Sequence, residues 1–360
     1  MKLFTPGPVE MPQVAVTALS QQPLHHRSDE FRAVTEQLWI NLAYAFATEN
    51  PVVAIAGSGM TGIEAAMCNT LAEGSSILVV VHGRFGLRMV EIARCYGLRP
   101  IVIEQEWGAT VSADRIASEL RKHEEIQALW LVHVETSTGV ALPLANIAQS
   151  VRDIAPNILI CVDAVSSVGV QEVLPDEWDL DIVATASQKG LMSPPGLALV
   201  MLSKRAVLRI STAEQRSYTL DLNRIVDAMH SNRFVWTPPV NTVVALSKVL
   251  ELFRERTREV VWYERQEQSD MLKNRLKALG QSLYGVSNAV GLTIVQHSKA
   301  DILKHALKEK YGIVVAGGQG ELASKVLRIG TMGSIENSDI EYFLSSFKSV
   351  LDVADGKEQQ

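Results

Sequence analysis

The chain has 360 residues, of which 47% are hydrophobic and 21% are charged, and its formal net charge is −6. This length and apolar content suit a large buried core, with two domains as the default expectation. The negative net charge excludes a general attraction to nucleic acid or anionic membranes. Apolar runs such as "ILVVV" at 77–81 fall far short of the roughly 18 residues of a membrane helix.

The start of the chain and its cysteines predict a cytoplasmic location. Pro6 and Pro8 interrupt the first residues before the apolar core of a signal peptide forms. Cys68, Cys95 and Cys161 are scattered through apolar segments without the spacing of paired cysteines. They are typical of reduced thiols in the core of a cytoplasmic protein.

The first two-thirds of the chain predicts a mostly parallel β-sheet. Seven apolar, β-branched runs recur, at 52–56, 77–81, 101–103, 128–132, 158–162, 181–186 and 197–202. Amphipathic helical stretches such as "FGLRMVEIARCYG" separate most of them, which is typical of a parallel sheet covered by helices on both faces. The ten residues 187–196 are too few for a crossover helix, so the seventh strand is expected to be antiparallel.

The last third predicts a different unit. A long helix follows Pro239, and after about residue 251 a charged helix precedes strands in "VGLTIVQH", "GIVVAG" and "KVLRIG" and a final helix near 337–352. We expect an extended N-terminal arm over 1–14, a large domain over 15–250 and a smaller α+β domain over 251–360.

The segment "GSGMTG" at 57–62 allows two interpretations. It fits G-x-G-x-x-G between a strand and a helix, where backbone N–H groups and a helix N-terminus bind phosphate. A nicotinamide dinucleotide also needs an acidic residue about 20 positions on, where this chain has His82 and Arg84 but no carboxylate. A cofactor with one phosphate and no ribose fits better. The alternative is a tight turn that uses glycine for positive φ.

Functional side chains follow several other predicted strands. Phe85 follows the second strand, and His133, Glu135 and Thr136 follow the fourth. Asp163 follows the fifth strand and Lys189 follows the sixth. Ligands of open α/β sheets bind at the carboxyl ends of strands, so these side chains are expected at one edge. Singly, Asp163 suits a helix cap, Phe85 the core and Lys189 a snorkelling position. Together they suit pyridoxal 5′-phosphate, which needs a lysine, an acid and a phosphate site.

The chain resembles the class V aminotransferases of the type I pyridoxal-phosphate fold, in the alanine/serine–glyoxylate (or pyruvate) aminotransferase branch. Matching segments run through nearly the whole chain and include "TPGPVEMP", "HHRSDEF", "HVETSTG", "VDAVSSVG", "SQKGLMSPPG", "WTPPVNT" and "KVLRIGTMG". The resemblance implies an α/β fold, with a seven-stranded mostly parallel sheet in the large domain and a smaller C-terminal domain. It also implies a homodimer whose active sites lie at the interface.

The resemblance assigns roles to single positions. Lys189 would bind the cofactor covalently and move the proton, Asp163 would pair with the pyridine nitrogen, and Arg328 would bind the substrate carboxylate through its bidentate fork. The residues implied around the cofactor ring are Phe85, Val165 and Thr136. Those implied at the phosphate are Ser58, Gly59, Met60 and Gln188, with Thr237 of the partner subunit. Gly7 would line the substrate side. The alternative for Arg328 is a surface ion pair.

Some positions depart from the family or lack a role. Where some relatives have a tyrosine three residues before the threonine, this chain has Phe234, so the partner is expected to contribute less to phosphate binding. His26 and Arg27 match a family signature near the site entrance without an assigned role. Tyr218 either approaches the substrate or packs in the core or a loop.

The predicted reaction moves an amino group from a small amino acid, alanine or serine favoured, to a 2-oxo acid such as glyoxylate or pyruvate. Besides Arg328, no second arginine is evidently placed to bind a side-chain carboxylate of the substrate. This absence favours small donors. Aspartate, phosphoserine or aminophosphonate donors and a lyase reaction are the alternatives. A nicotinamide oxidoreductase is less favoured.

A cysteine desulfurase is disfavoured because Cys161, the last cysteine, lies within a strand. A pyridoxal-fold transcription regulator is disfavoured because no N-terminal DNA-binding segment or basic patch is evident. The expected partners are small molecules and a second copy of the chain, with no metal, nucleic acid or membrane.

Overall fold

The larger of two main β-sheets has seven strands in the order β2–β10–β9–β8–β5–β3–β4 in the computed structural model, which describes residues 1–354. The strands are β2 (Val52–Gly57), β3 (Ser76–Val81), β4 (Arg99–Glu104), β5 (Ile126–Val132), β8 (Leu159–Asp163), β9 (Ile182–Ala186) and β10 (Gly196–Leu202). All neighbouring pairs from β4 to β9 are parallel. Only β10 is reversed, and it is antiparallel to both β9 and β2. The predicted strands and the predicted reversal of the seventh strand are confirmed.

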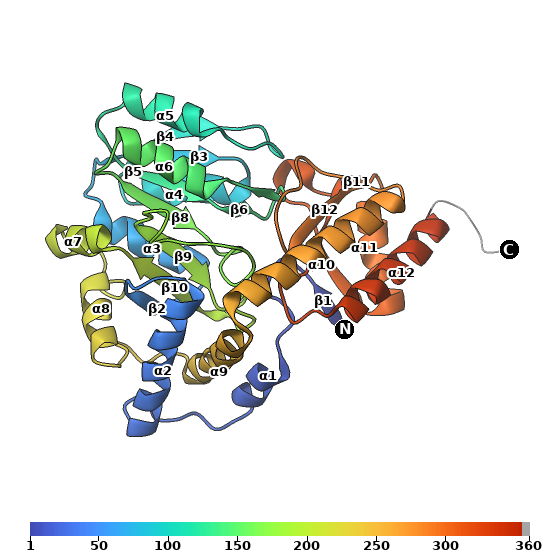
Figure 1. Ribbon diagram of the computed structural model, residues 1–360, viewed down its shortest axis with the longest axis horizontal. Helices are drawn as coiled ribbons and strands as arrows, with labels where there is room; N and C mark the ends of the chain where they lie inside the picture. The colour runs from blue at the N-terminus through green and yellow to red at the C-terminus, as the bar shows by residue number, and fades with distance from the viewer. Residues whose placement is uncertain (355–360) are drawn as a thin grey trace.

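Helices cover both faces of this sheet (Figure 1). They are α1 (Gln13–Leu19), α2 (Asp29–Ala45), α3 (Gly59–Thr70), α4 (Arg84–Cys95), α5 (Ala113–Lys122), α6 (Leu144–Ile154), α7 (Lys204–Thr212), α8 (Leu222–His230) and α9 (Val240–Arg256). Strand side chains alternate between two cores: Val52 and Ala54 lie in one, and Val53 and Ile55 lie in the other. Within residues 1–354, no helix has both the length and the apolar character needed to cross a membrane.

The second sheet forms the other half of the molecule in Figure 1. Its strands, in the order β1–β13–β14–β12–β11, are β1 (Lys2–Phe4), β13 (Ile313–Gly317), β14 (Val326–Gly330), β12 (Leu292–Gln296) and β11 (Ser282–Leu283). Around it lie α10 (Arg258–Ala278), α11 (Ala300–Tyr311), a 3₁₀ turn (Gly320–Leu322) and α12 (Asn337–Ala354). A short pair, β6 (Val134–Glu135) and β7 (Val140–Ala141), stands apart from both sheets.

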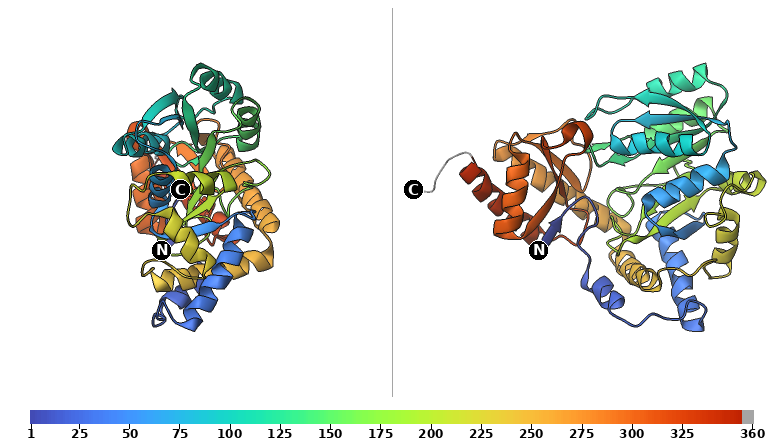
Figure 2. Two further views of the ribbon diagram at one scale, coloured as in Figure 1. Left: turned by 90° about the vertical axis from the view of Figure 1, so that its left-hand side faces the viewer. Right: turned by 180° about the vertical axis from the view of Figure 1, so that it is seen from behind.

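The N-terminal arm connects the two halves. β1 pairs in parallel with β13 at the edge of the second sheet, and the chain then passes to α1 and α2 beside the first sheet (Figure 2, right). The arm predicted as simply extended therefore begins with a paired strand. The domain limits at residues 14 and 250 stay predictions.

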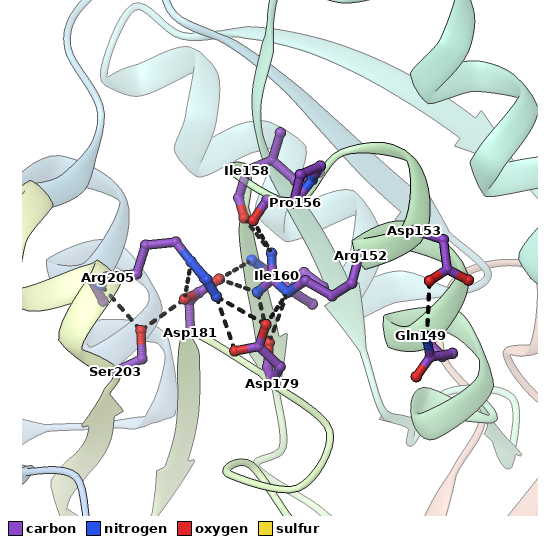
Figure 3. A network of polar contacts seen from close by, with 11 residues as sticks. Gln149, Arg152, Asp153, Pro156, Ile158, Ile160, Asp179, Asp181, Ser203 and Arg205 are labelled. Atoms are coloured by element: carbon purple, nitrogen blue, oxygen red, sulfur yellow. Dashed lines mark hydrogen bonds and ion pairs between the residues drawn. The ribbon is translucent and has the colours of Figure 1, made fainter.

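A buried network of ion pairs connects helices α6 and α7 to the amino ends of β8 and β9 (Figure 3). Asp181 is fully buried and bonds to Arg152 of α6 at 2.6 Å and to Arg205 of α7 at 3.1 Å. It also accepts a hydrogen bond from the Ile160 backbone N–H at 2.8 Å. Asp179 pairs with the same two arginines. This edge is opposite the one where the predicted functional residues lie.

Candidate active site

One cavity of about 160 Å³ lies at the carboxyl ends of β2, β8 and β9. Its lining residues are Ser58, Gly59, Met60, Phe85, Arg88, Val134, Thr136, Asp163, Val165, Ser166, Gln188 and Lys189. The sequence predicted all of these as cofactor-binding residues except Arg88, Val134 and Ser166. The topology therefore brings together side chains from five separate segments of the chain.

Lys189 follows β9 and directs its amine toward the N-terminal arm. Its Nζ donates a hydrogen bond to the carbonyl oxygen of Pro6. Burial lowers the pKa of Lys189 to about 8, Asp163 opposes this shift, and Arg328 adds to it. A substantial fraction of the amine is therefore neutral near pH 8, which is the form that acts as a nucleophile or a base.

Asp163 is the last residue of β8 and is 3% exposed. Its Oδ1 accepts a hydrogen bond from the Val165 backbone N–H at 2.9 Å, which fixes the carboxyl orientation. Burial raises the pKa of Asp163 to about 7; the Val165 N–H and Lys189 lower it, and Glu135 raises it further. A cationic partner in the cavity would favour the ionised form, as a protonated pyridine nitrogen does.

The turn between β2 and α3 forms the phosphate end of the cavity. At Gly57, with φ +150°, an added Cβ would lie 2.3 Å from the Thr61 hydroxyl oxygen, and that oxygen accepts the Ser58 N–H at 3.1 Å. At Gly59, an added Cβ would lie 2.5 Å from Val165 Cγ2. Only glycine lets the chain pass this closely, and the N-terminus of α3 thereby opens into the cavity.

The cavity fits pyridoxal 5′-phosphate on its own features. A lysine and a buried acid stand in it with a helix N-terminus suited to a phosphate. Within residues 1–354, the buried Oε1 of Gln188 has no hydrogen-bond partner. Buried polar atoms are normally paired, so this oxygen calls for a partner, and the amide turned over by 180° would present its NH₂ group to an anion at that position.

Arg328 belongs to the second sheet, and its side chain contacts Thr136 in the wall of the cavity. It lies on β14, is 7% exposed, and donates from Nη1 to the Thr136 carbonyl at 3.1 Å and from Nε to the Gly317 carbonyl at 2.7 Å. Burial lowers the pKa of Arg328, and the negative charge of Glu135 opposes that effect. The alternative of a surface ion pair is wrong, because this guanidinium is buried beside Thr136.

Arg88, Val134 and Ser166 line the cavity although they were not predicted. Arg88 lies one helical turn after Phe85, and its guanidinium carbon is 4.9 Å from the centre of the Phe85 ring, within cation–π range. The spacing i, i+3 on a helix places two residues on one face and was the available signal. Val134 stands two positions before Thr136, which is the same-face spacing of an extended chain.

Three predicted site residues, Gly7, Thr237 and Arg328, are not among the residues that line the cavity of their own chain. Thr237 is exposed and borders a separate small hollow between β2 and residues 233–238. Phe234 packs against Trp39 and Phe31, with ring centres 5.3 and 6.2 Å apart. Within one chain, Thr237 therefore has no contact with the predicted cofactor site.

Of the three positions without a single assigned role, Tyr218 and Arg27 are exposed and His26 is half-buried. Tyr218 is 64% exposed and its ring centre is 5.1 Å from that of Trp236, so it is not a core residue. His26 and Arg27 border a separate hollow of about 630 Å³ near α2 and α8. The prediction of three core cysteines is wrong for Cys95, which is exposed. It follows Arg94 on the solvent-facing side of amphipathic α4.

The sheet topology, the lysine and the buried acid place the protein among the pyridoxal-phosphate enzymes of type I fold. The family profile described as "Aminotransferase class-V" matches residues 10–343. The chain therefore belongs to the class V aminotransferases, and its cofactor is pyridoxal 5′-phosphate.

Individual relatives match over almost the whole chain. The 42 kDa subunit of a soluble hydrogenase from Anabaena cylindrica is 35% identical over 357 residues, which cover 98% of this chain and 93% of that protein. The crystal structure of an alanine–glyoxylate aminotransferase from Nostoc sp. has a TM-score of 0.92 and 30% identity, covering 97% and 94% of the two chains. An aspartate aminotransferase from Thermus thermophilus has a TM-score of 0.91 and 34% identity, covering 98% and 99%.

Proposed function

We propose that this aminotransferase takes its amino group from a small amino acid, with alanine or serine favoured, and gives it to glyoxylate or pyruvate. The observation that carries the proposal is the position of Arg328, whose guanidinium meets Thr136 at the cavity that holds Lys189 and Asp163. One arginine suffices for the α-carboxylate of a small amino acid. The similarity to the alanine–glyoxylate aminotransferase of Nostoc sp. supports the same choice.

Each residue has a distinct task in this proposal. Pyridoxal phosphate, when bound, supplies the electron sink for breaking the bond between the substrate α-carbon and its hydrogen. Lys189 would hold the cofactor covalently and, as a free amine, would move the α-proton of the substrate. Asp163 keeps the pyridine nitrogen protonated. Arg328 orients the carboxylate, and the backbone near Gly7 closes the substrate side.

The remaining lining residues bind the cofactor. Phe85 and Val165 would hold its ring, and Thr136 would bind its phenolic oxygen. The phosphate would be bound by Ser58, Gly59, Met60 and Gln188, together with Thr237 of the partner subunit. The opening of α3 at this end supports the assignment, because N–H groups at a helix N-terminus favour an anion.

A dicarboxylic donor such as aspartate is the second candidate. Arg88 favours it, because this chain has a second guanidinium at the wall of the cavity. The similarity to the aspartate aminotransferase of Thermus thermophilus supports it too. Arg88 packs over the Phe85 ring and lines a hollow together with Met60, a residue of the proposed phosphate end, so we place it second.

A donor panel separates the two candidates. The cofactor-loaded enzyme is mixed with alanine, serine or aspartate without an acceptor, and the change in cofactor absorbance gives each half-reaction rate. We expect alanine and serine to react at least about tenfold faster than aspartate. A faster reaction with aspartate that is lost in Arg88→Gln would overturn the small-donor proposal and establish the second candidate.

The proposal includes a homodimer in which Thr237 serves the neighbouring site. The exposure of Thr237 and of the Trp236 ring beside it supports this, since neither completes the cavity of its own chain. Mixing Lys189→Ala with Thr237→Val chains tests it at a cofactor concentration that leaves Thr237→Val largely unloaded. Mixed dimers would contain one site with both native residues, so cofactor binding and turnover should reappear. Their absence in a mixture shown to form mixed dimers would contradict the shared site.

A cytoplasmic location belongs to the same proposal. The three cysteines are free thiols, and two of them, Cys68 and Cys161, are buried. Burial raises the pKa of both thiols, which keeps them protonated and unreactive.

A further inference from the structure

We propose that Glu135 is a positioning residue: its buried carboxylate fixes Phe85 at the cofactor ring and, through the next residue, fixes Arg328 at the substrate carboxylate. The inference rests on the proposed roles of Phe85 and Arg328. Glu135 itself is not among the residues that line the cavity.

The Glu135 carboxylate is fully buried and bonded through both oxygens. Oε2 accepts the backbone N–H groups of Phe85 at 2.9 Å and Gly86 at 3.2 Å. Oε1 accepts the backbone N–H of Ser137 at 3.0 Å and its hydroxyl at 2.6 Å. Four donors therefore surround one carboxylate, whose two oxygens have acceptor sites for all of them.

These bonds replace a cap that α4 lacks. The residue before the helix is Gly83, which has no side chain to bond the free N–H groups of the first turn. Glu135 bonds the second and third of these groups, and the Ser137 hydroxyl accepts the first, from Arg84, at 2.9 Å. A Cβ at Gly83 would lie 2.3 Å from Glu135 Cγ, so the contact excludes larger residues. The start of α4, and with it Phe85, is therefore placed by a segment about 50 residues away.

The same segment holds the substrate arginine. Arg328 donates to the carbonyl oxygen of Thr136, which stands between Glu135 and Ser137. Glu135 is also the negative charge that offsets the effect of burial on the Arg328 pKa. A displacement of Glu135 would consequently move a wall of the cofactor cavity and the carboxylate-binding group together.

Glu135→Gln tests this role with almost no change in shape. One carboxylate oxygen becomes an NH₂ group, which would face backbone donors instead of accepting from them. We expect the dissociation constant of pyridoxal phosphate, titrated into cofactor-free protein, to rise at least about tenfold. We also expect the visible circular dichroism of the bound cofactor to weaken and the KM for the donor to rise.

The matched control is Asp221→Asn. Asp221 also caps a helix with a buried carboxylate, accepting the N–H groups of Asn223 at 3.1 Å and Arg224 at 3.3 Å at the start of α8. It does not line the cavity. A purely structural cap predicts the same result for both variants: a lower Tm with unchanged cofactor affinity, dichroism and KM. We expect that result for Asp221→Asn alone.

Ser137→Ala provides the second variant if Glu135→Gln does not fold. It keeps the carboxylate but removes the hydroxyl that links Glu135 to Arg84, so smaller changes in the same direction are expected. Unchanged cofactor affinity and dichroism in whichever of the two variants folds would overturn the proposal. Failure of the proposed donor specificity would appear in the substrate panel only, because cofactor binding and dichroism are measured without substrate.

Discussion

Gly7 packs directly on the side chain of Lys189. A Cβ added to Gly7 would lie 2.5 Å from Lys189 Cδ and Cε and 2.7 Å from Nζ. The preceding residue, Pro6, accepts the hydrogen bond from the Lys189 amine. The first residues of the chain therefore form one wall of the space in which the reactive amine moves, although their strand β1 belongs to the other sheet.

Gly7→Ala should impair catalysis by displacing Lys189. Gly7 has φ +132°, so alanine would bring backbone strain as well as the collision with Lys189. We expect kcat to fall by roughly tenfold or more, because small misplacements of reacting groups are costly. Gly280→Ala is the control: φ is +75° there, but nothing lies within 4 Å of an added Cβ. The control should lose about 1 kcal/mol of stability and keep its kcat. A Gly7→Ala enzyme with wild-type kcat would contradict the proposed wall.

The lowered pKa of Lys189 predicts the pH dependence of cofactor capture. The neutral amine is the nucleophile, so the rate at which cofactor-free protein binds pyridoxal phosphate covalently should rise with pH and level off above about 8. Stopped-flow absorbance measures this rate. An ordinary lysine has its pKa near 10.5, so a rate that kept rising about tenfold per pH unit up to pH 10 would contradict the effect of burial.

Much of the fold could be predicted because buried parallel strands have apolar sequences without interruption. The ten residues after β9 also revealed the reversal of β10, since chain length alone excludes a crossover helix. Asp163 and Lys189 were predicted through the same logic, because Asp163 ends one recognisable strand and Lys189 stands three residues after another. Topology then placed them at one edge.

The features that sequence patterns missed depend on contacts between distant segments. β1 has three residues, too few for a periodic pattern, and it becomes a strand only because β13 is there to pair with it. Glu135 was recognised at a strand end, but its partners are backbone N–H groups of α4, which carry no sequence signature. Cys95 was misplaced because its apolar neighbours outweighed its position on the outer side of the helix.

Asp163→Asn should change how the stability of the cofactor-free protein depends on pH. Burial raises the pKa of Asp163 from 3.8 to about 7. Between these values the unfolded chain has lost the proton while the folded protein still binds it, so this residue's contribution to stability declines as pH rises through that range. The full loss is on the order of 4 kcal/mol. Asparagine has no such titration and can still accept from Val165 through its carbonyl oxygen.

Urea unfolding of both cofactor-free proteins at pH 5 and pH 8 measures this effect. The free energy of unfolding of Asp163→Asn relative to wild type should be higher at pH 8 than at pH 5. Cofactor affinity should fall in the same variant, because a neutral amide is a poorer partner for a protonated pyridine nitrogen. Equal differences at the two pH values would show that Asp163 is ionised in the folded protein throughout this range.

Asp181→Asn should destabilise the protein without affecting the active site. Asp181 has no exposed surface and neutralises Arg152 and Arg205, so the amide would leave two guanidinium groups dependent on the exposed Asp179 (Figure 3). Removing one partner from a buried ion pair typically costs about 3–5 kcal/mol. Thermal unfolding of the loaded enzyme should show a clearly lower Tm, while kcat and cofactor affinity below that temperature stay at wild-type values.

Asp176→Asn is the control, since Asp176 is an exposed carboxylate that accepts the Glu49 N–H at 2.8 Å. Its loss should stay within about 1 kcal/mol. If Asp181→Asn lowered the free energy of unfolding no more than this control does, the ion pairs would add no net stability. Their mutual attraction would then only offset the cost of removing the charges from water. If it lowered cofactor affinity, the two edges of the sheet would be coupled through β8 and β9.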